Sequence, residues 1–219
     1  MRVEKIHIGE SGCANILSYM KNQVHLRLRT TAEQVACLER LQVAFAEACN
    51  ELGPLVRETR CWNRVALHHL AYHRLRERFP ALGSQMVCNA IYSVCRSARA
   101  IYQNPGSPWC VDKRLAQGLP LMRFAPSAPV FFDRHTLSVK RGRLSLYTLD
   151  GRVRFDMEIS EENERRFAEE KLREIQLRRD QQGFSLLFSF GELADKGERD
   201  AELPEYVVLV ESNQAVKAA

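Results

Sequence analysis

Basic side chains recur at alternate positions between residues 140 and 154. Arg152 and Arg154 alternate with Val153 and Phe155, which in a β-strand places both arginines on one face, about 7 Å apart. Cations at this spacing suit a phosphate backbone that lies across a sheet. We interpret the segment as a nucleic-acid-binding face, with a solvated sheet edge as the alternative. Its basic residues are Lys140, Arg141, Arg143, Arg152 and Arg154.

The distribution of charge favours the same kind of partner. The chain has a formal net charge of +5 at pH 7. Residues 113–154 hold nine basic and two acidic residues, whereas the last 29 residues hold three basic and seven acidic ones. A strongly basic segment repels itself until an anion neutralises it, and nucleic-acid phosphates do this by ion pairing and counterion release. A solvated basic face is the alternative, but the alternation of the arginines favours nucleic acid.

The histidines and cysteines of the sequence do not occur in patterns that predict a catalytic site. His69 and His73 have the spacing of two metal ligands on a helix, but no third ligand accompanies them. The seven cysteines form no CxxC pair, and Cys61 beside Arg60 is the one thiol in a mildly electropositive setting. The chain has no phosphate-binding loop and no GxGxxG, GxSxG or HExxH motif. We therefore expect no cofactor and no metal.

Length and composition predict a cytoplasmic protein without a membrane association. The 219 residues suffice for one large domain or two small ones with a buried core. No apolar run approaches the roughly 20 residues that a membrane-spanning helix needs, and the first residues lack the layout of a secretory signal. The odd number and irregular spacing of the cysteines do not fit a disulfide framework.

The first half of the sequence predicts one strand and three helices. Residues 22–29 alternate like a half-buried strand, with Arg27 and Arg29 on the basic outer face. A threonine at position 30 or 31 caps the first helix, which we expect to end at the Gly53-Pro54 pair. The helices are expected at residues 31–52, 62–79 and 84–103, and five of the eight prolines predict a long connection at 104–129.

Beyond residue 129 the hydrophobic period changes to that of β-strands. Turn signals at Arg141-Gly142, Asp150-Gly151 and Gln181-Gln182-Gly183 predict hairpins, and residues 161–170 predict a short charged helix. Strands are expected at residues 130–133, 136–140, 143–149, 152–159, 172–179 and 184–190. This order predicts an α+β fold, an oligonucleotide-binding-type antiparallel β-barrel that a helical domain interrupts.

Several motifs occur in a specific order. They are a strand ending in Arg27-Leu28-Arg29-Thr30, then Glu33-Gln34, Asn50, Trp62-Asn63, residues 72–80, Leu82-Gly83-Ser84-Gln85, Phe131-Phe132-Asp133 and residues 137–146. The combination YxxLRxxxPxLxSQ followed by FDxxxxSxKxGRLSL is far more specific than any single piece. In this order the chain resembles, over roughly residues 22–190, the N-terminal half of TnpB, the RNA-guided nuclease of transposons, and of its type V CRISPR relatives.

The resemblance implies a division of the chain into four parts. In that family the split strand set is the wedge domain, a β-barrel that grips the guide RNA scaffold. The helical insert is the recognition domain, which faces the guide–target duplex and the short DNA motif beside the target. The implied parts are an N-terminal segment with the first wedge strand (1–30), a helical recognition domain (31–110), the rest of the wedge barrel (111–190) and an acidic C-terminal tail (191–219).

The nuclease of the family has no counterpart in this plan. Cleavage in TnpB-like proteins comes from a RuvC-like domain with three metal-binding acids. Here 29 residues follow Phe190, and residues 205–213 resemble a remnant of the first RuvC strand, with Glu211 near the position of a catalytic Asp. We expect the nuclease to be missing or to reside in another chain.

The sequence thus predicts a guide-RNA-binding, RNA-guided DNA-recognition protein without its own nuclease. Its expected partners are guide RNA, target DNA and a separate RuvC-like subunit or a second copy. The alternatives are an RNA-independent, sequence-specific DNA-binding regulator and a basic interaction subunit of a larger nucleoprotein complex. The RNA-binding candidates are Arg27, Arg29, Lys140, Arg141, Arg143, Arg152 and Arg154. The DNA-binding candidates, by analogy with the motif-reading helix of the family, are Ser84, Gln85, Asn89 and Tyr92.

Overall fold

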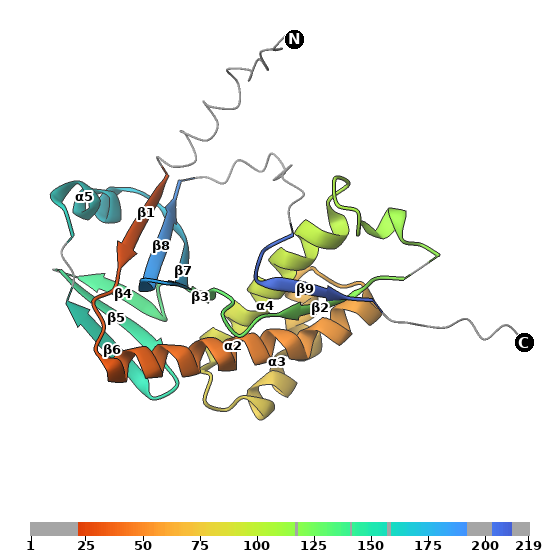
Figure 1. Ribbon diagram of the computed structural model, residues 1–219, viewed down its shortest axis with the longest axis horizontal. Helices are drawn as coiled ribbons and strands as arrows, with labels where there is room; N and C mark the ends of the chain where they lie inside the picture. The colour runs from red at the N-terminus through yellow and green to blue at the C-terminus, as the bar shows by residue number, and fades with distance from the viewer. Residues whose placement is uncertain (1–21, 117, 141, 157–158, 192–202, 212–219) are drawn as a thin grey trace, which may run out of the picture.

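A long helix, α2, runs along the molecule and contacts both the strands and the other large helices (Figure 1). The computed structural model describes residues 22–116, 118–140, 142–156, 159–191 and 203–211. The helices are α2 (Ala32–Thr59), α3 (Arg64–Arg78), α4 (Ser84–Ala98) and α5 (Glu161–Glu169), with a π-helical turn at Arg99–Gln103 and a 3₁₀ turn at Val111–Lys113. The strands are β1 (Gln23–Arg27), β2 (Leu121–Phe124), β3 (Val130–Phe132), β4 (Leu137–Lys140), β5 (Arg143–Thr148), β6 (Gly151–Asp156), β7 (Leu172–Asp180), β8 (Gly183–Phe190) and β9 (Val207–Val210).

The first turn of α2 has the cap that the sequence predicts. The Thr31 hydroxyl accepts a hydrogen bond from the Gln34 amide at 3.2 Å, and the Thr31 amide donates to the Gln34 side chain at 2.9 Å. This reciprocal pair satisfies two backbone donors that the start of a helix leaves unpaired. The capping-box prediction is therefore confirmed at Thr31.

The predicted end of the same helix is wrong, because α2 continues through Gly53 and Pro54 to Thr59. Two contacts with β2 hold this part of the helix. The Asn50 side chain donates to the Phe124 carbonyl at 3.0 Å and accepts from the Phe124 amide at 2.7 Å. At Gly53 a side chain would bring a Cβ atom within 2.6 Å of the Met122 carbonyl oxygen. The glycine thus permits close helix–strand packing, and this packing outweighs the cost of an interior proline.

The strand set is split by the helices, as predicted. β1 pairs antiparallel with β8, about 160 residues further along the chain, and Val24 lies opposite Phe188. The four-stranded sheet has the order β1-β8-β7-β3, and β4-β5-β6 form a separate three-stranded sheet. Helices α2, α3 and α4 lie between β1 and the other strands in sequence. The class of the fold, mixed α+β with antiparallel sheets, is confirmed.

No sheet of the described residues closes into a barrel, which differs from the predicted closed barrel. β3 and β4 follow each other in the chain but belong to different sheets. Helix α2 contacts the backbone of β6, since the side chain of Gln34 donates a hydrogen bond to the Arg154 carbonyl at 3.1 Å. Helix α5 covers part of β8, where Phe167 packs edge-to-face on Phe188. Sheet edges can be protected by helices instead of by closure.

The strand pairs β4–β5, β5–β6 and β7–β8 form where the turn signals predict hairpins, and one further strand pair was not predicted. Gly151 has φ +99° between β5 and β6, and Gly183 has φ +113° between β7 and β8, backbone conformations that favour glycine. The missed pair is β2 with β9, where Leu121 lies opposite Val210. β9 lies within residues 205–213, where the resemblance implied a strand, whereas β2 was expected to be part of the long connection. Both strands are four residues long, and such short strands carry almost no periodic signal.

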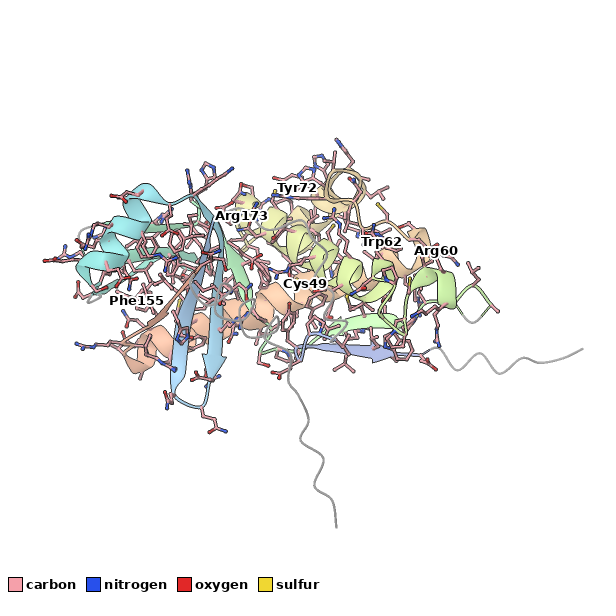
Figure 2. The ribbon with its side chains drawn as sticks, turned by 90° about the horizontal axis from the view of Figure 1, so that it is seen from above. Cys49, Arg60, Trp62, Tyr72, Phe155 and Arg173 are labelled. Carbon is pink, nitrogen blue, oxygen red and sulfur yellow. The ribbon has the colours of Figure 1, made fainter. Side chains whose placement is uncertain are left out.

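One hydrophobic core connects the helices with the strands. Leu41 of α2, Met86 of α4, Leu144 of β5 and Phe188 of β8 belong to the same cluster of buried residues. Figure 2 shows Cys49 in the interior, where its thiol lies 3.8 Å from the Ala90 carbonyl of α4. The domain boundaries at residues 30, 110 and 190 stay predictions.

Candidate nucleic-acid interface

The sheet β4-β5-β6 has one buried face and one solvent-facing side, here called the outer face. In β5, Leu144 and Leu146 are buried, whereas Arg143 is exposed and Tyr147 is half-buried. The pleat alternates side chains between the two faces. Along the outer face the structure places Ser138 of β4, Arg143, Ser145 and Tyr147 of β5, and Arg152, Arg154 and Asp156 of β6.

The register of this sheet brings the predicted arginines together. Arg152 lies opposite Tyr147, and Arg154 lies opposite Ser145. Both arginine side chains are exposed, so the predicted common face of Arg152 and Arg154 is confirmed. In the β4–β5 register Lys140 lies opposite Arg143. The side chain of Lys140 and the whole of Arg141 lie outside the described residues.

The arginine side chains of the outer face differ in their hydrogen bonds and ion pairs. Arg152 donates to the His135 carbonyl at 2.5 Å and to the Ser145 hydroxyl at 3.4 Å. Arg143 lies 3.4 Å from the Asp156 carboxylate, and both of these side chains are largely exposed. Arg154 has no side-chain partner among the described residues. Surface pairs of this kind contribute little stability, so the guanidinium groups can exchange them for phosphate.

Arg27 and Arg29 lie outside this sheet. Arg27 ends β1 and makes a two-pronged ion pair with Asp180, at 2.6 and 2.9 Å. The hydrogen bond from Arg27 holds the pKa of the Asp180 carboxyl below its usual value. Arg29 is exposed just before α2. The structure therefore does not bring these two residues together with Arg152 and Arg154 on one sheet face.

The N-terminus of α4 adjoins the outer face. Gly83 is the N-cap, and no side chain caps this helix, so Ser84 is the first helical residue and does not serve as the cap. A Cβ atom at Gly83 would lie 3.0–3.3 Å from three atoms of the Tyr147 side chain. The DNA-binding candidates Ser84 and Gln85 thus directly follow the residue against which the ring of Tyr147 packs.

Asp133 links the two candidate surfaces, although the sequence analysis gave it no role. It follows β3 and accepts hydrogen bonds from the His135 amide at 3.0 Å and from the Thr136 hydroxyl at 2.9 Å. Its other carboxylate oxygen accepts from the Gln85 side chain. The same turn presents the His135 carbonyl to Arg152. Gln85 and Arg152 are therefore held by a single turn.

Asn89 and Tyr92 are less accessible than the sequence suggested. Asn89 is 5% exposed, and its Nδ2 has no hydrogen-bond partner among the described residues. Tyr92 donates to the Glu174 carboxylate at 2.8 Å, and burial, with the nearby negative charge of Glu174, raises its pKa to about 12. Asn89 was predicted to contact DNA, which needs an exposed side chain, but the structure buries it because α4 packs against α2, α3 and β3.

Three further residues belong to the interface but were not singled out from the sequence. Arg134 and His135 are exposed in the turn after Asp133, and Arg134 has no partner among the described residues. Tyr147 lies on the outer face opposite Arg152. A signal was available for Tyr147, since strand alternation puts it in phase with Arg143 and Ser145. The loop residues had no periodic signal.

The remaining reactive residues form no site in the described part of the chain. His69 and His73 are exposed on α3, and the described residues contain no group of three or more potential metal ligands. The six described cysteines are free thiols. Burial raises the pKa of Cys49, and it raises the pKa of Cys95 to about 11, so both stay protonated at neutral pH. Cys61 is half-buried.

The C-terminal strand provides one carboxylate with a defined partner. Glu211 directly follows β9 and lies 2.6 Å from the Arg114 guanidinium. Arg114 also lies over the ring of Trp109, 4.8 Å from its centroid. The carboxylate that was predicted to lie near the position of a catalytic Asp thus pairs with a cation of the same chain.

Comparisons with known proteins add no family. No protein-family model matches the chain, and no curated protein matches it. The resemblance to TnpB therefore stays a prediction. Among the described residues, no helix has the length and apolar character to cross a bilayer.

Proposed function

We propose that this protein is a cytoplasmic RNA-binding protein that recognises DNA with its bound RNA as the guide, and that it has no nuclease of its own. The outer face of β4-β5-β6 binds the RNA. The N-terminus of α4 faces the DNA, and a RuvC-like partner or a second copy of the chain supplies further functions.

The observation that carries this proposal is the chemistry of the outer face. Three arginines from two paired strands lie among hydroxyl groups and one tyrosine, and Asp156 is the one acidic residue of β4, β5 and β6. Guanidinium groups bind phosphate oxygens through planar, charge-assisted hydrogen bonds. The arginines are Arg143, Arg152 and Arg154.

The split order of the strands supports RNA as the nucleic acid. β1 joins β8 across the helical insert, and the TnpB-like wedge domains that the sequence resembles are split in the same way. We propose that the strands form an open version of this oligonucleotide-binding arrangement. A sheet face can contact phosphates and 2′-hydroxyl groups without entering the deep, narrow groove of an RNA helix.

We assign DNA recognition to the exposed start of α4. Ser84 is exposed, Gln85 is half-buried, and the backbone amides of the first turn lack a side-chain cap. Such a helix end offers donors to phosphates and base edges. The proposal rests on Ser84 and Gln85 more than on the buried Asn89, while base pairing with the guide supplies sequence specificity.

The test compares two triple variants that remove the same charge. Arg143, Arg152 and Arg154 are replaced by Ala in one variant, and the exposed Arg99, Arg123 and Arg165 are replaced by Ala in the other. RNA affinity is measured at several salt concentrations by filter binding. The first variant should weaken RNA binding more than recognition of the DNA motif. It should also flatten the log–log salt dependence by somewhat under one unit per lost phosphate contact.

Two results would contradict the proposal. Equal loss of affinity and slope in both triple variants would show that bulk charge, and not the outer face, determines binding. The second result combines two observations: ribonuclease does not change the 260/280 nm absorbance ratio of the purified protein, and the protein still binds a fixed DNA duplex. Together they would favour the RNA-independent regulator.

A further inference from the structure

Tyr147 is the aromatic residue among the arginines of the outer face. It lies directly opposite Arg152 in the β5–β6 pair and two residues from Ser145, which lies opposite Arg154. Its ring is half-buried, and its hydroxyl group has no hydrogen-bond partner among the described residues. One side of the ring packs against the hydrophobic core, and the hydroxyl group is a polar tip that the described residues leave without a partner.

Gly83 leaves the space in which the ring lies. A Cβ atom at position 83 would come within 3.0 Å of Cε1, 3.2 Å of Cζ and 3.3 Å of the hydroxyl oxygen of Tyr147. The backbone of Gly83 has φ −56°, which any residue can adopt, so conformational freedom does not explain the glycine. Its missing side chain lets the ring rest against the backbone at the start of α4.

Of the two neighbouring cations, Arg152 is held by hydrogen bonds within the described part of the chain and Arg154 is not. The guanidinium group of Arg152 is tied to the His135 carbonyl and to Ser145. Arg154 follows two residues later on the same face, and its side chain has no partner among the described residues. The outer face therefore offers one aromatic side chain on β5 beside two cations on β6, which are about 7 Å apart along that strand.

We propose that Tyr147 stacks on an unpaired base of the bound RNA, while Arg152 and Arg154 bind the phosphates that flank this base. The inference rests on the proposed function and specifies its ligand as a single-stranded segment. Bases inside a duplex are stacked on each other and expose only their edges. Unpaired bases expose their faces, and proteins bind them by stacking on aromatic side chains.

The experiment uses an oligouridine RNA with one 2-aminopurine, tested as a single strand and as a duplex with its complement. Stacking on Tyr147 should quench the 2-aminopurine fluorescence of the single strand. Tyr147→Leu should remove the quenching and weaken single-strand binding by roughly 5- to 100-fold. Tyr147→Phe keeps the ring and should retain both. Tyr72→Leu is the matched control, because Tyr72 is also half-buried but lies on α3, apart from Phe155 and its sheet (Figure 2).

Gly83→Ala provides a second variant that leaves the tyrosine in place. The added methyl group requires the ring to shift by a few tenths of an ångström, so quenching should fall, though less than in Tyr147→Leu, while the melting temperature stays close to that of the wild type. The stacking site would be overturned if the wild type, Tyr147→Leu and Gly83→Ala gave equal quenching and equal affinity. It would also be overturned if the wild type did not quench the 2-aminopurine fluorescence. If binding still requires Arg143, Arg152 and Arg154, the proposed function survives that failure. If no RNA binds at all, both proposals fail.

Discussion

Asn89 places a polar amide inside the core of the molecule. The residue is 5% exposed, and its Nδ2 donor has no partner among the described residues. Ser93 and Ser97 follow on the same face of α4 and are also buried. An unpaired buried donor costs free energy, because its hydrogen bonds to water are lost without replacement.

We therefore expect Asn89→Leu to leave the protein as stable as the wild type or more stable. Leucine has the same branching and number of side-chain heavy atoms, and it removes an unpaired donor that costs about 1–3 kcal/mol. Urea unfolding followed by circular dichroism measures the free energy of unfolding. Gln85→Leu is the control, since it removes a hydrogen bond to Asp133 and should destabilise by about 1 kcal/mol. A loss of more than 2 kcal/mol in Asn89→Leu would mean that the amide is paired. A stable variant with weaker binding to the DNA motif would show that Asn89 reaches the DNA.

At the scale of elements, α2 and β2 pack closely against each other at Gly53. The carbonyl of Met122 approaches Gly53 so closely that a Cβ atom would lie 2.6 Å from the oxygen. The next residue, Pro54, is exposed and lies inside the helix. Glycine and proline, which are common at helix ends, therefore have different roles here: Gly53 makes room for a strand, and Pro54 is tolerated.

Gly53→Ala should destabilise the protein by about 1–3 kcal/mol, because the new methyl group meets backbone that cannot move aside. In an ordinary helix the same change would stabilise by roughly 0.5–1 kcal/mol, so the sign of the effect is informative. Pro54→Ala is the control. It restores a backbone donor to α2 without a clash and should not lower the melting temperature. Stabilisation by Gly53→Ala would show that β2 does not pack on α2 at this point.

At the scale of the molecule, α2 organises the strands and the helices around one core. The four-stranded and three-stranded sheets lie at the first half of α2, and α3, α4 and the β2–β9 pair lie along its second half (Figure 1). Glu211, at the end of β9, is paired with Arg114. The carboxylate that the sequence resemblance predicted near a nuclease position therefore already has a cation as partner.

The 219-residue chain should not cut DNA or RNA in Mg²⁺ or Mn²⁺. Metal-dependent phosphodiester cleavage needs several carboxylates around ions about 4 Å apart, and the described residues contain no group of three or more potential metal ligands. Radiolabelled single-stranded and duplex substrates, with and without co-purified RNA, provide the measurement. Cleavage that Glu211→Ala abolishes would refute the expectation. Cleavage unaffected by Glu211→Ala would point to a contaminating nuclease, which a second chromatographic step should remove.

The sequence by itself determined the local elements and the phase of their side chains. The Thr31 cap, the hairpins at Gly151 and Gly183, and the common face of Arg152 and Arg154 all follow from interactions within a few residues. Such interactions are encoded in the spacing of residue types, because the α and β periods are fixed by backbone geometry. The α+β class followed from the order of these elements.

Only the tertiary structure decided how the elements meet. The passage of α2 through Gly53, the β2–β9 pair, the open sheets and the contact of Tyr147 with Gly83 all depend on residues far apart in the chain. Asn89 was predicted from the sequence to contact DNA, but the packing of α4 against α2, α3 and β3 buries it. Local patterns cannot predict these features, because each depends on which surfaces come together, and tertiary packing outweighs local preference wherever the two compete.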